Sequence, residues 1–457
     1  MEMQIQSVEK KENSHGRQGT VWTATAHVIT ATIGSGVLAL SWSVAQLGWI
    51  IGPIALFSFS AITYYTSILL AECYRYPDPI DGTRNPTYII AVKSYLGPKN
   101  VLVCIITQYT TLWGALISYT LTSVISMREV IKHETNGSSV SVNMCMIMFG
   151  VISILLSLFP NLEDITWLSV LAAAMSFGYS IISLCLCIMK WISHGNLRGS
   201  LMGVMSMHNA NISPATKTWQ IFQALGNIAF AFSFSQLLIE IQDTLKSPPS
   251  ENVTMKKASL YGIGVTTVFY VAIGCIGYAA FGDATPGNIL TGFSKPLWLV
   301  DMANIFIIVH LIGAYQMFAQ PIFIVVEEKI ASKWSGATFF QKVYTVRVPF
   351  TKAKSIRLMP GNFVLRSSII VLTTLVSMLL PFFNAIMGWL GAAGFWPLNV
   401  YLPITMYLSQ RKIKRGASKW FLLHGLSMGC LVVCVAALIG STAGIIDSLK
   451  HTNPFQI

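Results

Sequence analysis

Long stretches of apolar residues are separated by short polar segments along most of the chain. Each stretch is roughly 20 residues or longer, and a helix of about 20 apolar residues spans the ~30 Å hydrocarbon core of a bilayer. The backbone N–H and C=O groups of such a segment must be satisfied within it, so we expect helices. The pattern predicts an all-α polytopic membrane protein with eleven transmembrane helices, over residues 21–47, 50–72, 101–127, 142–159, 165–189, 219–242, 258–281, 297–326, 363–380, 384–408 and 419–440.

Two of the predicted helices are interrupted by small and polar residues near their centres. The first contains ATIGSGVLALSW (31–42), in which Gly34 and Gly36 flank a serine, and glycine is a poor helix former. The sixth, FQALGNIAFAFSFSQLLIEIQ, meets the run AFSFS (231–235) before its helical pattern resumes. Non-helical backbone within a membrane is tolerated only where it lines a cavity or is buried in protein. We therefore expect a broken helix at each place.

The two interrupted helices hold the same position in two successive groups of five. An odd number of spans gives the groups opposite orientations, and inverted repeats with paired broken helices are typical of secondary transporters. The prediction is a 5+5 inverted repeat with broken helices 1 and 6 plus one extra helix. Its parts are a cytoplasmic N-terminal tail (1–19), a first five-helix repeat (20–190), an extracellular loop (191–217), a second five-helix repeat (218–408), and an eleventh helix with a short extracellular C-terminus (409–457).

The small residues of the first interruption have a second interpretation. Small residues also let membrane helices pack closely, and Gly34 and Gly36 alone favour neither role. The matching interruption in the sixth helix favours a binding site, because the amides that begin a half-helix carry partial positive charge and suit a carboxylate.

Charge supports the membrane interpretation and sets the orientation. Charged residues make up 11% of the chain, against about 25% in soluble proteins. If the N-terminus is cytoplasmic, most of the 30 Lys and Arg residues fall in cytoplasmic segments, as the positive-inside rule requires. The net charge of +12 is spread over many short loops, so nucleic-acid binding is not expected. Two glycosylation sequons, at Asn136 and Asn211, fall in predicted outer loops.

Six stretches together identify a family. They are IGSGVLALSWSVAQLGW (33–49), DGTRNPTYIIAVKSYLG (81–97), SFSQLLIEIQDTLKSPP (233–249), YAAFGD (278–283), HLIGAYQMFAQPIF (310–323) and GFWPLNVYLPITMY (394–407). The chain resembles the plant amino acid permeases of the amino acid/auxin permease family over nearly its whole length. The resemblance implies a leucine-transporter-type fold, a plasma-membrane location and proton-driven uptake of amino acids. The shorter loop after the third span and the sequence of that span depart from the family pattern, so substrate preference is not carried over.

The interruptions supply the candidate substrate-binding residues. The backbone from Ile33 to Val37 is expected to bind a carboxylate, and carbonyls near Thr32 and Ala231 are expected to accept from an ammonium group. Aromatic side chains beside the breaks and in neighbouring spans can form the pocket wall. The full set is Thr32, Ile33, Gly34, Ser35, Gly36, Val37, Tyr109, Ala231, Phe232, Phe234 and Tyr315.

Proton coupling requires a group that gains and loses a proton. His27 and His310 lie well inside predicted spans, where ionisable groups are expensive and functional by default. Glu240 follows the break in the sixth span. A structural alternative stays open for the histidines, since a buried neutral imidazole can bridge two helices.

A proton–amino acid symporter is thus the leading hypothesis, with amino acids, H⁺ and membrane lipid as partners and the proton gradient in place of a cofactor. A related carrier of auxin or γ-aminobutyrate is one alternative, and an amino acid sensor that does not transport is another. An enzyme is not expected, because the sequence holds no H-E-x-x-H motif, nucleophile elbow or phosphate-binding loop.

Overall fold

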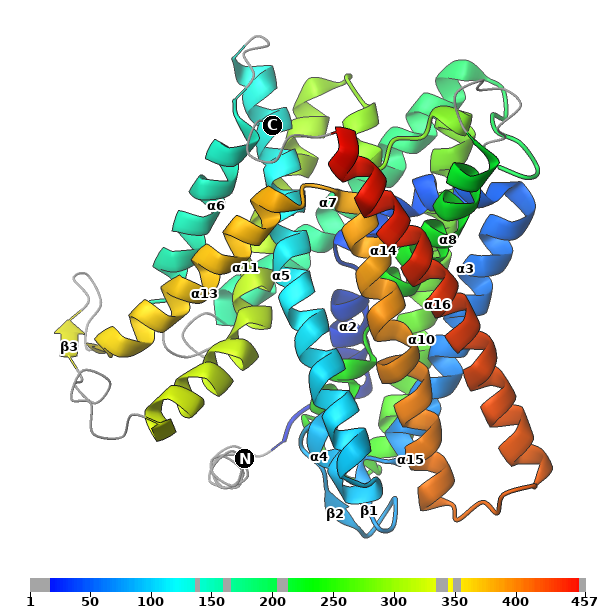
Figure 1. Ribbon diagram of the computed structural model, residues 1–457, viewed down its shortest axis with the longest axis vertical. Coiled ribbons are helices and arrows are strands. Elements are labelled where there is room, and N and C mark those ends of the chain that lie inside the picture. Colours follow the sequence, from blue (N-terminus) through cyan, green and yellow to red (C-terminus); the bar gives the residue numbers. More distant parts are fainter. Residues whose placement is uncertain are drawn as a thin grey trace. The chain divides into compact units, whose positions relative to one another are not determined.

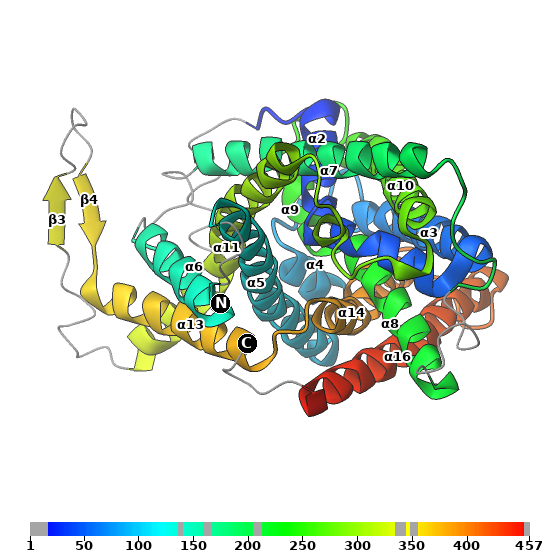
Figure 2. The same cartoon turned by 90° about the horizontal axis from the view of Figure 1, so that it is seen from above.

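In the part of the chain that the structure describes, helices occupy most of each apolar stretch that the sequence predicts as a span. The computed structural model describes residues 17–135, 140–158, 166–203, 213–333, 344–347 and 355–451 (Figures 1 and 2). By length and composition, eight helices of this described part could cross a membrane, and α6 (Val142–Leu156) is a shorter apolar helix. The strands among the described residues form two short antiparallel pairs, β1–β2 and β3–β4. The chain is an all-α multi-pass membrane protein.

The contacts within the chain define two compact units, each made of separate segments. The first unit comprises the described residues of Met1–Gln108, His194–Thr285 and Met387–Thr442. The second comprises those of Tyr109–Ser193, Pro286–Ile386 and Ala443–Ile457. The predicted repeats, which concern symmetry and not packing alone, stay a prediction.

The first unit holds both interrupted helices. In it α10 lies beside α3 and α2, and α3 also lies beside α8 (Figure 2). Its elements are α2 (Val21–Thr32), η1 (Ser35–Ala39), α3 (Leu40–Glu72), β1 (Arg75–Tyr76), β2 (Thr83–Arg84), α4 (Tyr88–Tyr95), the start of α5 (Pro98–Glu134), α8 (Pro214–Ala231), η3 (Ser235–Leu237), α9 (Leu238–Asp243), α10 (Glu251–Phe281), η4 (Gly282–Ala284), most of α14 (Phe383–Gly394), η6 (Phe395–Tyr401), α15 (Leu402–Gln410) and most of α16 (Ser418–His451).

The second unit packs α13 against α6 and α11 (Figure 1). The Arg366 guanidinium of α13 donates to Glu327 of α11, with Nε 2.6 Å from Oε1, and to the carbonyl of Ser157 at 3.1 Å. Its elements are α5 (Pro98–Glu134) from Tyr109 onward, α6, α7 (Thr166–His194), η5 (Ile289–Gly292), α11 (Leu297–Lys333), β3 (Tyr344–Arg347), β4 (Ser355–Leu358), α13 (Pro360–Leu379) and the start of α14 (Phe383–Gly394).

The predicted span 384–408 is less regular than the hydropathy pattern suggests. A seven-residue π-helical segment, η6, separates α14 from α15. Pro397 lies within it and has no N–H to donate to the preceding turn. Such π segments are frequent at functional sites, and this one presents Asn399 to the break that follows α8.

Ion pairs gather at the end of the first unit that the sequence predicts to be cytoplasmic. Glu72 pairs with Lys256 and Arg411. Glu251 pairs with the guanidinium groups of Arg75 and Arg84, at 2.7 and 2.9 Å. Basic residues of three predicted inner segments thus bind acidic residues at helix ends.

Candidate substrate site

The first helix is broken where the sequence predicts it. Helix α2 ends at Thr32, because Ile33 leaves the helical region (φ −77°, ψ 89°) and Gly34 is extended (φ −124°, ψ −155°). The chain resumes as the 3₁₀-helix η1 at Ser35 and continues into α3. Gly34 is the cap of η1 and offers no side chain, so the first amides of η1 are left for another acceptor.

The second break has the same plan. Helix α8 ends at Ala231, Phe232 and Phe234 leave helical geometry, and η3 begins at Ser235 before α9. The cap residue of η3 makes no side-chain hydrogen bond either. Each interrupted span therefore has a half-helix start without a side-chain cap.

Tyr270 of α10 joins the two breaks. Its hydroxyl lies 2.6 Å from the carbonyl oxygen of Thr32 and 3.2 Å from that of Ala231, and its ring meets the Phe232 ring edge to face at 5.2 Å. The Thr32 carbonyl also accepts from the amide of Gly34 at 2.9 Å. A carbonyl oxygen has two lone pairs, so the expectation that the Thr32 carbonyl is free for an ammonium group is wrong in this structure. The Ala231 carbonyl accepts from one donor in the described chain, the Tyr270 hydroxyl, so it keeps a lone pair for an ammonium group.

Polar side chains at both breaks lack partners. The hydroxyl of Ser35 beside the first break, and the hydroxyl of Ser235 and the Oε1 of Gln236 beside the second, are buried without a hydrogen bond to any residue that the structure describes. A buried polar group without a partner costs about 1–3 kcal/mol. A polar substrate would remove that cost.

The two glycines of the first break differ. A Cβ built on Gly34 would have no atom within 4 Å, so Gly34 borders open space. A Cβ on Gly36 would lie 3.1 Å from the Cα and 3.2 Å from the Cβ of Ala231. Gly36 thus allows η1 to pack closely on the end of α8, as the helix-packing interpretation predicts. Gly34 instead leaves room for a ligand, as the binding-site interpretation predicts.

The other candidate residues of the first unit lie at the breaks, and their role as pocket walls stays a prediction. Ile33, Val37, Phe232 and Phe234 are fully or almost fully buried. The Asn399 side chain of η6 makes two long hydrogen bonds at the second break. Its Nδ2 lies 3.5 Å from the Phe232 carbonyl and 3.4 Å from the Ser233 hydroxyl.

Sequence reasoning did not select Tyr270 or Asn399. The available signal for Tyr270 was a hydroxyl inside an apolar span. For Asn399 it was an asparagine two residues after a proline in the middle of a span.

Tyr109 and Tyr315 belong to the second unit, and their role as pocket walls stays a prediction. Tyr109 is half-buried on α5. The hydroxyl of Tyr315 lies 2.7 Å from that of Thr373 on α13, and its ring meets Phe149 edge to face at 5.6 Å.

The three candidates for proton coupling have different surroundings. Glu240 of α9 accepts one hydrogen bond at Oε1, from the amide of Tyr88 at 3.2 Å, and its Oε2 is buried with no partner among the described residues. His310 of α11 is buried, with Nδ1 2.8 Å from the carbonyl of Ala172. His27 is exposed on α2. The two sequons, at Asn136 and Asn211, lie outside the described residues.

The sequence matches known proteins over almost its full length. Residues 17–447 match the family model described as transmembrane amino acid transporter protein. Amino acid permease 3 of Arabidopsis thaliana is 48% identical over 454 residues, covering 97% of this chain and 94% of that protein. Amino acid permease 4 of the same plant is 49% identical, covering 96% of each.

Two solved structures share the fold at low sequence identity. MhsT in complex with L-phenylalanine has a TM-score of 0.55 at 10% identity, covering 94% of this chain and 100% of that one. The nucleobase-cation-symport-1 family transporter Mhp1 has a TM-score of 0.51 at 12% identity, covering 95% and 93%.

Proposed function

Since the chain belongs to the family of transmembrane amino acid transporter proteins, we propose that it carries amino acids into the cell across the plasma membrane together with protons. The chain is a transporter and not an enzyme, and the resemblance stated from the sequence is confirmed. Beyond the family, the proposal names the proton as the coupling ion, the plasma membrane as the location, and substrate binding at the two breaks as the mechanism.

The observation that carries the mechanism is the pair of breaks held by one tyrosine. Both first half-helices end at carbonyls that Tyr270 contacts, and both second half-helices begin without a side-chain cap. In this arrangement the amides at Ser35 and Gly36 bind the substrate carboxylate. The carbonyl of Ala231 accepts from the ammonium group, and Phe232 and Phe234 border the side chain.

The composition of the two units supports the inverted repeat. Spans 1 and 2 of the first predicted half and spans 6 and 7 of the second fall in the same unit. Spans 3 to 5 and spans 8 and 9, apart from the start of α5, fall in the other. Equivalent spans of two halves are expected to group in this way when the halves share a fold. With eleven spans, the N-terminus is cytoplasmic and the C-terminus extracellular.

The predicted cytoplasmic ends of the two broken spans are held together. Gly19 and Thr244 share a backbone hydrogen bond of 3.0 Å, and Arg17 donates to the side chain and carbonyl of Asp243 at 3.0 and 2.7 Å. Burial and the neighbouring Asp243 carboxylate raise the pKa of the Tyr74 phenol well above its ordinary value, so the phenol stays protonated and donates to Asp243. Alternating access requires these contacts to open.

Glu240 is the foremost coupling residue in this proposal. A buried carboxylate without a cation partner is costly, and Glu240 lacks an ion-pair partner among the described residues. Loading a proton onto this carboxyl group removes the charge. A membrane potential of about 150 mV and about two pH units supply roughly 6 kcal/mol per proton, enough for about 10⁴-fold accumulation.

Voltage-clamp recording of cells that express the chain tests the function. We expect amino acids to evoke inward current at acidic external pH in sodium-free medium. An absolute requirement for sodium would overturn proton coupling. Competition of indole-3-acetate and γ-aminobutyrate against labelled L-leucine separates the related carriers, and surface-expressed protein without uptake would indicate a sensor.

Glu240→Gln tests the coupling residue in the same cells. We expect the current to lose its increase on acidification, while His27→Gln and His310→Gln serve as comparison variants. A Glu240→Gln profile identical to that of the unmodified protein removes Glu240 from the coupling path.

A further inference from the structure

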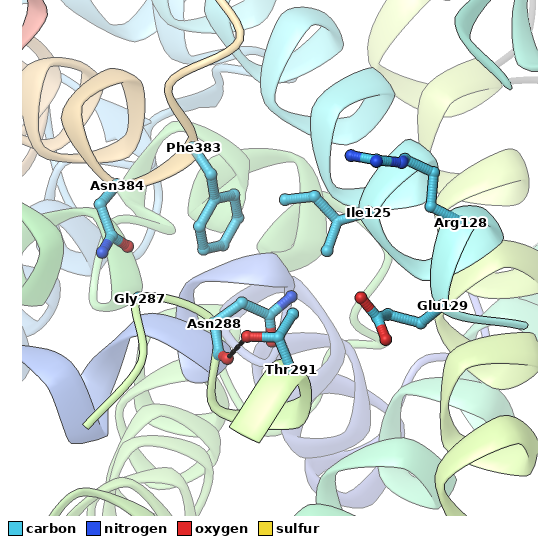
Figure 3. Close-up of a pocket in the computed structure, with 8 residues that line it drawn as sticks. All are labelled: Ile125, Arg128, Glu129, Gly287, Asn288, Thr291, Phe383 and Asn384. Atoms are coloured by element: carbon cyan, nitrogen blue, oxygen red, sulfur yellow. Dashed lines mark hydrogen bonds between the residues drawn. The ribbon is translucent and has the colours of Figure 1, made fainter. Parts of the chain in front are cut away.

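A cavity lies in the second unit, among residues that belong to that unit alone. Its volume is about 310 Å³, within the range of about 300–1,000 Å³ typical of small-molecule pockets. The cavity is lined by the end of α5, the segment around η5 and the start of α14, from which Figure 3 shows Ile125, Arg128, Glu129, Gly287, Asn288, Thr291, Phe383 and Asn384. All three elements lie on the side that the sequence predicts to be extracellular.

The lining presents both charges of a zwitterion. Arg128 and Glu129 are adjacent on α5, half-buried, and neither has an ion-pair partner in the part of the chain that the structure describes. Figure 3 shows the two side chains reaching from α5 to the border of the hollow. An unpaired guanidinium suits a carboxylate, and an unpaired carboxylate suits an ammonium group.

An asparagine opposite the charges points to a missing partner. Asn288 is only 5% exposed; its Oδ1 accepts from the amide of Leu290 at 3.1 Å, but its Nδ2 has no partner among the described residues. In Figure 3 this amide nitrogen faces the side of the hollow where Glu129 lies. The Oδ1 of Asn384 is likewise buried and without a partner in the described chain. Two amide groups therefore need hydrogen-bonding partners that the surrounding residues do not supply.

The walls between these polar groups are apolar. The ring of Phe383 and the side chain of Ile125 lie on opposite sides of the hollow (Figure 3). They offer a surface for an apolar or aromatic side chain.

We infer that this cavity is a second, outward-facing amino acid site, which binds zwitterions with an apolar side chain before they reach the breaks. The inference rests on the proposed function for the extracellular orientation and for the ligand class. Arg128 binds the carboxylate, Glu129 binds the ammonium group, and the Asn288 and Asn384 amides complete the shell.

Protection of an introduced cysteine tests the site. Thr291→Cys places a thiol on the exposed rim of the cavity, and Ser294→Cys places one outside the lining three residues later. Intact cells are treated with a membrane-impermeant thiol reagent, with and without L-phenylalanine, and the unmodified protein reports labelling of native cysteines. At roughly ten times its Kd, L-phenylalanine should slow labelling of Thr291→Cys about tenfold, because only the unoccupied site reacts. Ser294→Cys should not change.

Two further arms assign the protection to this cavity. Gly34→Leu, which blocks the breaks, should leave the protection intact, whereas Arg128→Gln and Glu129→Gln should each remove it. Phenethylamine lacks the carboxylate and 3-phenylpropionate lacks the ammonium group, so both should protect poorly.

Three outcomes would overturn the site. They are no protection up to the solubility limit of L-phenylalanine, loss of protection with Gly34→Leu, and protection that survives in both charge variants. Labelling requires no proton gradient, so failure of the proposed function appears separately, as absent current.

Discussion

Two interruptions marked by glycine follow each other in the first unit, and the protein treats them in opposite ways. At Gly48 the backbone takes φ 81°, ψ 178° inside α3, and residues 200–203 pack against it. The amides of Trp49 and Ile50 donate to the carbonyls of Ser200 and Leu201, at 3.2 and 3.4 Å. At Gly34 no atom lies within 4 Å of the position that a Cβ would take, and the neighbouring Ser35 hydroxyl has no partner among the described residues.

The comparison shows what makes an interrupted helix a site. A break frees backbone donors and acceptors, which must find partners when buried. Where another segment of the protein supplies them, as at Gly48, the break is a structural corner. Where the protein leaves them unmet beside open space, as at Gly34, a ligand can supply them.

Gly34→Leu should have the largest effect on transport. The added side chain enters the open space beside the break and leaves less room for the substrate, so we expect roughly a hundredfold loss of affinity, which corresponds to about 3 kcal/mol. Radiolabelled uptake measures the loss, normalised to surface expression. Gly264→Leu on α10 is the matched control, because Gly264 also has no atom within 4 Å of its Cβ position and is exposed. Normal uptake by Gly34→Leu would contradict the binding role.

Gly48→Ala should lower stability and leave substrate affinity unchanged. A non-glycine residue in this backbone region costs about 1–3 kcal/mol, and the Cβ would lie 2.2 Å from the amide nitrogen of Gly203. Thermal denaturation of the purified protein measures the loss, and uptake by the folded fraction gives KM. A changed KM at unchanged stability would remove the distinction between the two breaks.

Tyr270→Phe should weaken transport by an intermediate amount. It removes the hydroxyl that contacts the ends of both first half-helices, at a cost of about 1–2 kcal/mol, or roughly tenfold in uptake at low substrate concentration. Tyr261→Phe, an exposed tyrosine on the same helix, is the control. Equal activity of the two variants would show that the hydroxyl does not organise the breaks.

Ser35→Ala should give the smallest effect. If its unpartnered hydroxyl binds the substrate carboxylate, KM rises several-fold, for a loss of about 1 kcal/mol, while thermal stability is kept. Ser67→Ala removes another buried hydroxyl without a partner in the described chain, further along α3, and should leave KM unchanged. Equal KM values for both variants would show that the Ser35 hydroxyl does not bind the substrate, which would leave only the backbone at the first break to contact it.

The positions of the helices could be predicted closely from the sequence. The boundary expected between residues 47 and 50 lies at Gly48, and the break expected at Ile33–Gly36 is present. Hydropathy determines these features, because each span must satisfy its own backbone and small residues mark where it does not. The π segment η6 was not predicted, since hydropathy does not distinguish it from α-helix.

The roles of individual residues at the breaks could be predicted only in part. Gly34 and Gly36 are two residues apart and chemically identical, yet one borders open space and the other contacts Ala231. The Thr32 carbonyl is occupied because a tyrosine 238 positions later reaches it. Contacts at that separation leave no local signal in the sequence.

By itself, the sequence determined that the chain is a multi-pass helical membrane protein of the amino acid transporter family, broken in its first and sixth spans. Apolar length, charge asymmetry and motif residues are properties of neighbouring positions, so they can be read along the chain. Only the tertiary structure decided which freed groups are satisfied, which glycine borders space, and that Arg128, Glu129 and Asn288 share a cavity. Those are properties of packing, which depends on segments that the sequence keeps far apart.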